Sequence, residues 1–274
     1  MFNSIRAIFR SRHQTKDSVS FRDQDIKDAV KTNRNSLLSI DNWIDEAAFK
    51  KSWFQYGVPD FIRSNINKKI STSPTYTDYM VVLARNYFNR LNYLEIGVSV
   101  GKNFFQIMRA FPEGEMTGFD IEEINPILEH QLTLIKTDEW ETTPVSMKKN
   151  NSSLKTYHHG NQSVHYLCAD VWDELSWARL EGNKYNLVFS DALHSPEAIL
   201  FEFEMLVKYK LLDEKFVIVW DDLVGKMKNS FFRIIKKYHV QYNIQNTYLI
   251  QVNGWIGEHE GPHSVGIISN FPFK

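Results

Sequence analysis

The sequence has little of three features that would place a protein in a class at once: cysteine, net charge and long apolar runs. Cys168 is the one cysteine among 274 residues, so an internal disulfide is excluded and a reducing compartment, the cytoplasm, is expected. The formal net charge of −1 gives no global field that would attract nucleic acid, and we expect no such partner. No apolar run approaches the roughly 18 residues that span a bilayer, so we expect no transmembrane segment.

Glycine is also missing where a dinucleotide-binding loop would need it. The apolar, β-prone run 93–96 leads into a turn bounded by Gly97 and Gly101, and residues 102–109 have helical character. A buried strand, a glycine turn and a helix in this order build nucleotide-sized sites in open α/β sheets. However, Ser99 takes the place of the middle glycine and no third glycine follows, so pyrophosphate binding is disfavoured.

Two acids near this turn suit a ligand that carries positive charge. Glu95 stands two residues before Gly97, where its carboxylate would repel phosphates and attract a cation. The segment 115–120 is predicted to be a second strand, and the acid at its end, Asp120, can accept hydrogen bonds from both ribose hydroxyls. An adenosine joined to a cationic amino-acid tail describes S-adenosylmethionine, which we expect as the cofactor.

Three segments carry a resemblance to a known family: residues 94–101, 187–194 and 217–222. They resemble class I S-adenosylmethionine-dependent methyltransferases of the metal-dependent O-methyltransferase type, which modify catechols and macrolide sugars. The resemblance implies an α/β fold with a Rossmann-like, seven-stranded sheet that is mostly parallel, ends in a C-terminal antiparallel strand pair and carries helices on both faces. It also implies that these residues hold the methyl donor: Glu95, Gly97, Ser99, Gly101, Asn103, Asp120 and Asp170.

The chain is predicted to divide into an N-terminal helical extension or lid, residues 1–70, and a methyltransferase domain, residues 71–274. Residues 1–16 carry no acid and gather apolar side chains on one helical face. This pattern indicates a membrane-surface or targeting helix, a frayed terminus or a helix docked on a partner. Residues 17–35 are interpreted as a loosely held helix or linker. Asp41 can cap a further helix, which is either a lid or plain packing on the outside of the domain.

The domain contains an insertion, residues 121–163, that is longer than a simple connection between two strands. Apolar residues between 127 and 135 suggest a helix, and the polar residues after it are interpreted as a loop. This loop is either a mobile surface excursion, which we favour, or a substrate-recognition or oligomer-forming element. If the protein forms a homo-oligomer, we expect the contacts in this insertion or in the N-terminal extension. His158 and His159 are not expected to bind metal.

Acids are also predicted at the ends of the third, fourth and fifth strands. Asp170 follows the third strand and accepts a hydrogen bond either from the adenine amino group or from the first turn of the next helix. Asp191 follows the fourth strand, and Asp221 and Asp222 follow the fifth, where the tips of neighbouring strands lie about 4.8 Å apart. Three such carboxylates repel one another unless a cation neutralises them. All-oxygen ligands favour Mg²⁺ or another hard divalent cation, although Asp222 has the alternative role of a helix cap.

His194 stands three residues after Asp191, at the predicted start of a helix. In the resembled family a basic residue at this position takes the proton of the acceptor hydroxyl, and histidine has a suitable pKa. The alternative is a histidine that only orients Asp191.

The sequence therefore predicts metal-assisted O-methylation of a hydroxyl on a small molecule, a sugar or an aromatic diol. The rival predictions are a nucleotide-dependent oxidoreductase on a similar sheet and a non-catalytic, methyltransferase-like scaffold protein.

Overall fold

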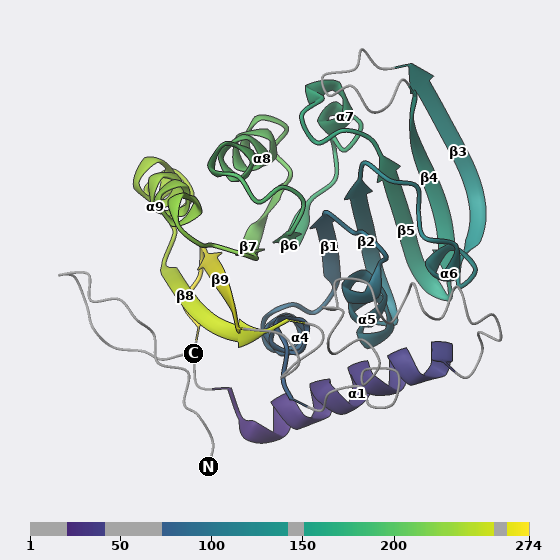
Figure 1. Ribbon diagram of the computed structural model, residues 1–274, viewed down its shortest axis with the longest axis horizontal. Coiled ribbons are helices and arrows are strands. Elements are labelled where there is room, and N and C mark those ends of the chain that lie inside the picture. The colour runs from purple at the N-terminus through teal and green to yellow at the C-terminus, as the bar shows by residue number, and fades with distance from the viewer. Residues whose placement is uncertain (1–20, 42–72, 142–150, 255–261, 274) are drawn as a thin grey trace, which may run out of the picture.

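A computed structural model describes residues 21–41, 73–141, 151–254 and 262–273 of the chain (Figure 1). The predicted amphipathic segment at residues 1–16 and the helix expected after Asp41 lie outside the described residues. The central part of the insertion, residues 142–150, does so as well.

Within the described residues, nine strands form a single sheet in the order β3-β4-β5-β2-β1-β6-β7-β9-β8. The five central strands, β5, β2, β1, β6 and β7, run parallel, whereas β9 lies antiparallel to β7 and β8 antiparallel to β9. The mostly parallel sheet with a C-terminal antiparallel pair confirms the predicted fold class. The strands are β1 (Leu91–Ile96), β2 (Glu113–Asp120), β3 (Thr133–Glu141), β4 (Asn151–His159), β5 (Asn161–Cys168), β6 (Tyr185–Ser190), β7 (Leu212–Trp220), β8 (Asn246–Asn253) and β9 (Pro262–Ser269).

The predicted number of seven strands was too low, because the insertion contributes two strands of its own. The expected helix ends early, at α6 (Pro126–Glu129), and β3 begins at Thr133. Residues expected to form a polar loop instead form β4, which pairs antiparallel with β5 and with β3. The physical reason is that β5 would otherwise be an unpaired sheet edge. Tyr157 of β4 is also fully buried, which ties this strand to the core.

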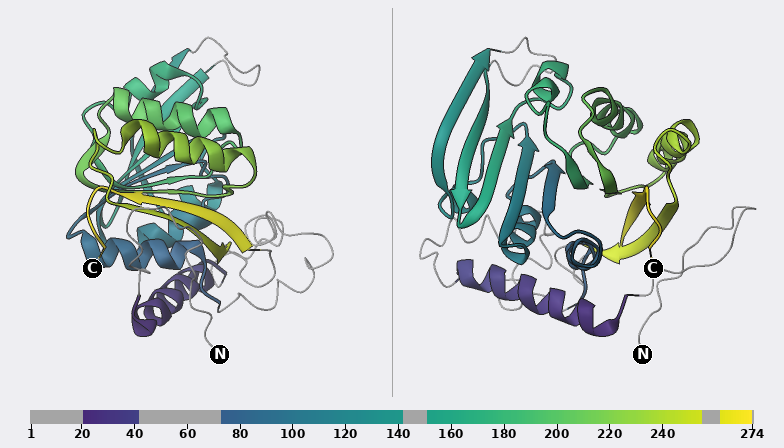
Figure 2. Two further views of the ribbon diagram at one scale, coloured as in Figure 1. Left: turned by 90° about the vertical axis from the view of Figure 1, so that its left-hand side faces the viewer. Right: turned by 180° about the vertical axis from the view of Figure 1, so that it is seen from behind.

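Helices cover both faces of the sheet, as predicted (Figures 1 and 2). One face carries α4, α5 and α6, with α1 running across the outside of α4 and α5, and the other face carries α7, α8 and α9. Besides α6, the helices are α1 (Asp23–Asp41), α4 (Tyr76–Tyr87), α5 (Lys102–Ala110), α7 (Glu174–Ala178), α8 (Pro196–Lys208) and α9 (Lys226–Tyr238). No helix of the described residues is long and apolar enough to cross a membrane.

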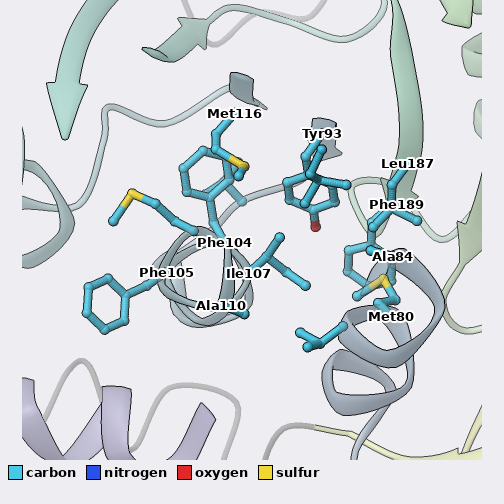
Figure 3. Packing of buried hydrophobic residues seen from close by; sticks show 14 of the residues in the cluster. Met80, Ala84, Tyr93, Phe104, Phe105, Ile107, Ala110, Met116, Leu187 and Phe189 are labelled. Carbon is cyan, nitrogen blue, oxygen red and sulfur yellow. The ribbon is translucent and has the colours of Figure 1, made fainter. Parts of the chain in front are cut away.

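Two clusters of buried side chains, one on each face, hold these layers together. Figure 3 shows the first, where Met80 of α4 and Phe104 and Ile107 of α5 meet Tyr93 of β1 and Phe189 of β6. Burying each such side chain contributes about 1.5–3 kcal/mol. All six residues of β6 are buried, as expected for a central parallel strand with helices on both faces.

The helix α1 is packed more firmly than the sequence suggested. Ala29, Leu37 and Ile40 are almost fully buried and belong to the same cluster as α4 and α5. These residues lie on one face of the helix because they recur at spacings close to whole turns. The helix expected among residues 17–35 is therefore confirmed for residues 23–35, but it is docked on the core and not loosely held.

Candidate active site

The ends of four neighbouring strands are locked in line by backbone hydrogen bonds. The amide of Gly97, after β1, donates to the carbonyl of Phe119 in β2 over 2.8 Å. The amide of Asp191, after β6, donates to Ile96 over 2.8 Å, and the amide of Asp221, after β7, donates to the carbonyl of Ser190, the last residue of β6, over 3.0 Å. The predicted acids therefore follow one another along a single edge of the sheet.

The glycine turn after β1 requires glycine for a steric reason. Gly97 has a φ of +86°, and a Cβ there would lie 2.5 Å from backbone atoms of Ala192. Gly101 has a φ of +81° and forms the N-cap of α5. Ser99, between them, adopts a φ of +52°, which is uncommon for a residue other than glycine, and its amide donates to the Asp120 carboxylate over 2.6 Å. The turn is thus held against both neighbouring strands.

Glu95 lies at the centre of this edge and is only 1% exposed. The Tyr93 hydroxyl and the Asn103 amide both donate to its Oε2, over 2.6 and 2.9 Å, whereas Oε1 has no hydrogen-bond partner among the described residues. Burial raises the pKa of the Glu95 carboxyl well above its usual value, and the nearby carboxylates of Asp191 and Asp120 add to this effect. A cationic ligand would relieve both causes.

Asp120 is the last residue of β2, and Asp170 follows the adjacent strand β5. Asp120 accepts from the amides of Ser99 and Glu122, one on each carboxylate oxygen. Asp170 accepts from the amide of Trp172 through Oδ1, whereas its buried Oδ2 has no partner within the part of the chain that the structure describes. The alternative role of Asp170 as a helix cap was wrong, because the N-cap of α7 is Asp173.

His194 joins two of the predicted metal-binding acids. Its Nε2 lies 3.0 Å from Asp191 Oδ1 and its Nδ1 lies 3.3 Å from Asp222 Oδ2. The hydrogen bond that His194 donates to the Asp191 carboxylate raises the pKa of the imidazole, and the histidine side chain is 48% exposed. The histidine immediately precedes Ser195, whose side chain caps α8, so the helix start fixes its backbone. A half-exposed imidazole between two carboxylates is well placed to exchange a proton with a ligand.

His263 completes the cluster, and the sequence analysis missed it. Its Nδ1 lies 2.7 Å from Asp221 Oδ2 and 3.4 Å from Asp222 Oδ1. In the described part of the chain, the ligand atoms of these three residues lie within 4.8 Å of one another, an arrangement that could hold a metal ion. The predicted ligand set of three acids therefore differs from this group, since Asp191 reaches Asp222 through His194.

The backbone at Asp222, in the adjacent pair Asp221 and Asp222, is strained. Asp222 has a φ of +50°, which is uncommon outside glycine and typical of functional sites. Burial raises the pKa of Asp221, which is 3% exposed, while its hydrogen bond with His263 opposes this effect. The alternative role of Asp222 as a cap of the next helix was wrong, because the N-cap of α9 is Gly225 and this helix has no side-chain cap.

Residues 94–223 match the family model of a methyltransferase domain. No curated protein sequence matches the chain.

Among solved structures, the O-methyltransferase TomG from Streptomyces achromogenes is 16% identical, with a TM-score of 0.49 over 90% of this chain and 98% of that one. Rv0187 from MTB is 14% identical, with a TM-score of 0.47 over 90% and 89%. MycE from the mycinamycin pathway, solved with Mg and SAH, is 14% identical, with a TM-score of 0.43 over 70% of this chain and 48% of MycE. These similarities are remote, and neither the substrate nor the metal of this chain follows from them. What the comparisons show is a match of residues 94–223, just under half of the chain, to a methyltransferase domain.

Proposed function

We propose that the protein transfers the methyl group of S-adenosylmethionine to a hydroxyl oxygen of a small molecule, with the help of a divalent cation. One observation carries the proposal. Acids at the carboxyl ends of five adjacent parallel strands share one edge of the sheet, and His194 lies between two of them. A sulfonium nucleoside and a cation both supply the positive charge that this edge needs.

The donor fits the half of the edge formed by β1, β2 and β5. The unpartnered Oδ2 of Asp170 suits the adenine amino group, which donates hydrogen bonds. Each oxygen of Asp120 has one backbone donor and retains a lone pair for a ribose hydroxyl. The free Oε1 of Glu95 suits the ammonium group of the amino-acid tail. Gly97, Ser99 and Gly101 would let the donor pass close to the backbone.

The cation fits the other half, formed by β6 and β7. Asp191, Asp221 and Asp222 repel one another without it, and Asp221, Asp222 and His263 form the tightest group. Because imidazole joins the carboxylates, Mn²⁺ or another transition metal suits this donor set at least as well as the predicted Mg²⁺. When bound, such an ion lowers the pKa of a hydroxyl held against it.

His194 would then take the proton from the acceptor hydroxyl. The Nδ1 of its half-exposed imidazole would accept this proton in place of the longer, 3.3 Å contact with Asp222, while the Asp191 carboxylate on Nε2 stabilises the protonated form. The oxygen attacks the methyl carbon as the carbon–sulfur bond breaks, so the sulfonium becomes a neutral thioether. Holding the two reactants in line supplies much of the acceleration, because the donor is already activated. A hydroxyl on a sugar or an aromatic diol is the acceptor that this chemistry favours.

Three further expectations remain part of this proposal. Residues 1–70 form an extension or lid beside the methyltransferase domain. A homo-oligomer would form through this extension or through the insertion, whose strand β3 lies at an edge of the described sheet and offers backbone groups for pairing. The single cysteine, which is buried, fits the reducing conditions of the cytoplasm.

The proposal is tested by calorimetry followed by a transfer assay. S-Adenosylhomocysteine should bind the purified protein. Mn²⁺ or Mg²⁺ should bind it independently, and this cation binding should be lost in Asp221→Asn. Labelled S-adenosylmethionine should then methylate members of a pool of sugars and aromatic diols. Binding of a nicotinamide cofactor in place of the sulfur nucleoside would favour the oxidoreductase. Donor binding without any methylated product across such pools would favour the scaffold protein.

A further inference from the structure

A chain of buried hydrogen bonds leads from the first turn of α4 to the donor-binding acid. The Thr77 hydroxyl donates to Asn103 Oδ1 over 2.7 Å. The Asn103 amide in turn donates to Glu95 Oε2 and to the Tyr93 hydroxyl, each over 2.9 Å. All four residues are at most 7% exposed. The position of Glu95 therefore depends on how closely α4 approaches α5.

The side chain of Arg34, in α1, bridges α4 and α5 next to the residues that form these hydrogen bonds. The Arg34 guanidinium contacts Asp78 of α4 through Nη2 over 2.8 Å and Gln106 of α5 through Nη1 over 3.2 Å. Asp78 is the neighbour of Thr77, and Gln106 lies one helical turn after Asn103. The side chain of Arg34 is 7% exposed and that of Asp78 is completely buried.

The carboxylate of Asp78 is itself fixed on several sides. Asn33 of α1 donates to its Oδ1 over 2.6 Å, and the amide of Thr75 donates to its Oδ2 over 2.8 Å in a capping box at the start of α4. A buried ion pair of this kind adds little stability compared with a well-packed apolar pair. The rigid guanidinium fork instead fixes the geometry of the groups around it. The arrangement is therefore better explained by positioning than by stability.

We propose that Arg34 is a positioning residue for the methyl donor. By clamping α4 to α5 it aligns Thr77 and Asn103, which hold Glu95 where its Oε1 receives the ammonium end of S-adenosylmethionine. The proposal rests on the proposed function, since it assumes that Glu95 faces the donor. It makes α1 a working part of the donor site, although this helix lies outside the segment matched by the family model.

Two ligands separate this role from a general loss of structure. S-Adenosylhomocysteine carries the amino-acid tail, whereas 5′-methylthioadenosine has the same nucleoside without it. Arg34→Met and Thr77→Val should each weaken binding of S-adenosylhomocysteine by roughly tenfold and leave that of 5′-methylthioadenosine within about twofold. Thr77→Ser keeps the hydroxyl and should bind both ligands as the unaltered protein does. Arg22→Met is the matched control, because this arginine is exposed and pairs only locally with Asp25.

The outcomes are distinct. Equal weakening of both ligands in Thr77→Val, with Thr77→Ser no better, would overturn the proposal in favour of a purely structural role. Unchanged binding of S-adenosylhomocysteine in Arg34→Met and Thr77→Val would overturn it as well. If Arg34→Met fails to fold, Thr77→Val and Arg34→Lys, which keeps the charge without the fork, decide the matter in the same assay. If the unaltered protein binds neither ligand, the proposed function itself fails, and this inference with it.

Discussion

The two halves of the acidic edge use the same kind of side chain in different surroundings. In the donor half, Glu95, Asp120 and Asp170 accept hydrogen bonds from backbone amides, a phenol and a carboxamide. In the cation half, Asp191 and Asp222 contact imidazoles. Neutral donors leave lone pairs for the hydroxyls and amines of a nucleoside. In the cation half the carboxylates repel one another, and the imidazoles that contact them are groups that can carry the positive charge that offsets this repulsion.

The largest expected effect separates the halves by activity. Asp191→Asn removes a charge from the cation half, and the neutral amide oxygen stabilises a protonated His194 less than the carboxylate does. We expect kcat to fall by roughly 100-fold or more, the usual range for losing base catalysis, while the affinity for S-adenosylhomocysteine stays within about twofold. Steady-state kinetics and calorimetry measure the two quantities. Glu181→Gln, an exposed acid on the surface, is the control, and a parallel loss of donor affinity would contradict the division into halves.

A second prediction concerns Gly97, where the turn after β1 in the donor half contacts Ala192 after β6 in the cation half. Gly97→Ala would place a Cβ 2.5 Å from the backbone of Ala192, so the turn and the β6 end would have to move apart. We expect a loss of about 2–4 kcal/mol in the free energy of unfolding, measured by denaturant titration, and weaker binding at both halves. In Gly160→Ala, which has a φ of +59° and no atom within 4 Å of the added Cβ, only the backbone strain of about 1–2 kcal/mol should appear. Equal losses in both variants would show that contact with Ala192 is unimportant.

A third prediction concerns Glu202, a buried acid next to the cation half, and its effect on stability as a function of pH. Glu202 of α8 accepts a hydrogen bond from Ser190, and burial raises the pKa of its carboxyl to about 8. An acid whose folded pKa is raised binds more protons when folded, so its contribution to stability is present at low pH and falls as pH rises toward 8. Glu202→Gln stays neutral and should lack this decline, gaining about 3 kcal/mol relative to the unaltered protein between pH 5 and pH 8.

Denaturant unfolding at several pH values measures this difference. Glu204→Gln, a half-exposed acid of the same helix that pairs with Lys237, is the control and should leave the pH dependence unchanged. Parallel pH profiles for Glu202→Gln and the unaltered protein would mean that the Glu202 carboxyl titrates normally.

What the sequence predicted and what it missed follow from the range of the interactions involved. The acids at Glu95, Asp120 and Asp191 each stand at or within two residues of the end of an apolar run, and parallel strands bring such ends together by geometry alone. His263 lies in β9, and its approach to Asp221 depends on an antiparallel strand returning beside β7. An antiparallel pair was predicted there, so the start of β9 was the available signal.

The insertion and α1 show what the sequence did not predict. Strand β4 is polar along much of its length, and only its pairing with β5 makes it a strand, which no local pattern could indicate. The ion pair of Arg34 with Asp78 joins residues 44 positions apart, and the local role of Asp78, in the capping box of α4, gives no sign of it. Contacts of this kind depend on helix packing, which the spacing of apolar residues in α1 indicated only as a helical face.

The smallest expected effect tests the donor half at a single atom. Asp170→Asn replaces the unpartnered Oδ2 by an amide that cannot accept a hydrogen bond from the adenine amino group, while Oδ1 can still accept from the amide of Trp172. We expect donor affinity to fall by roughly tenfold, the value of one hydrogen bond to a charged acceptor, without a change in cation affinity. Calorimetry with S-adenosylhomocysteine and with Mn²⁺ measures both. Asp173→Asn, at the N-cap of α7, should alter stability and leave donor affinity intact, so the opposite pattern would move adenine recognition from the end of β5 to the helix behind it.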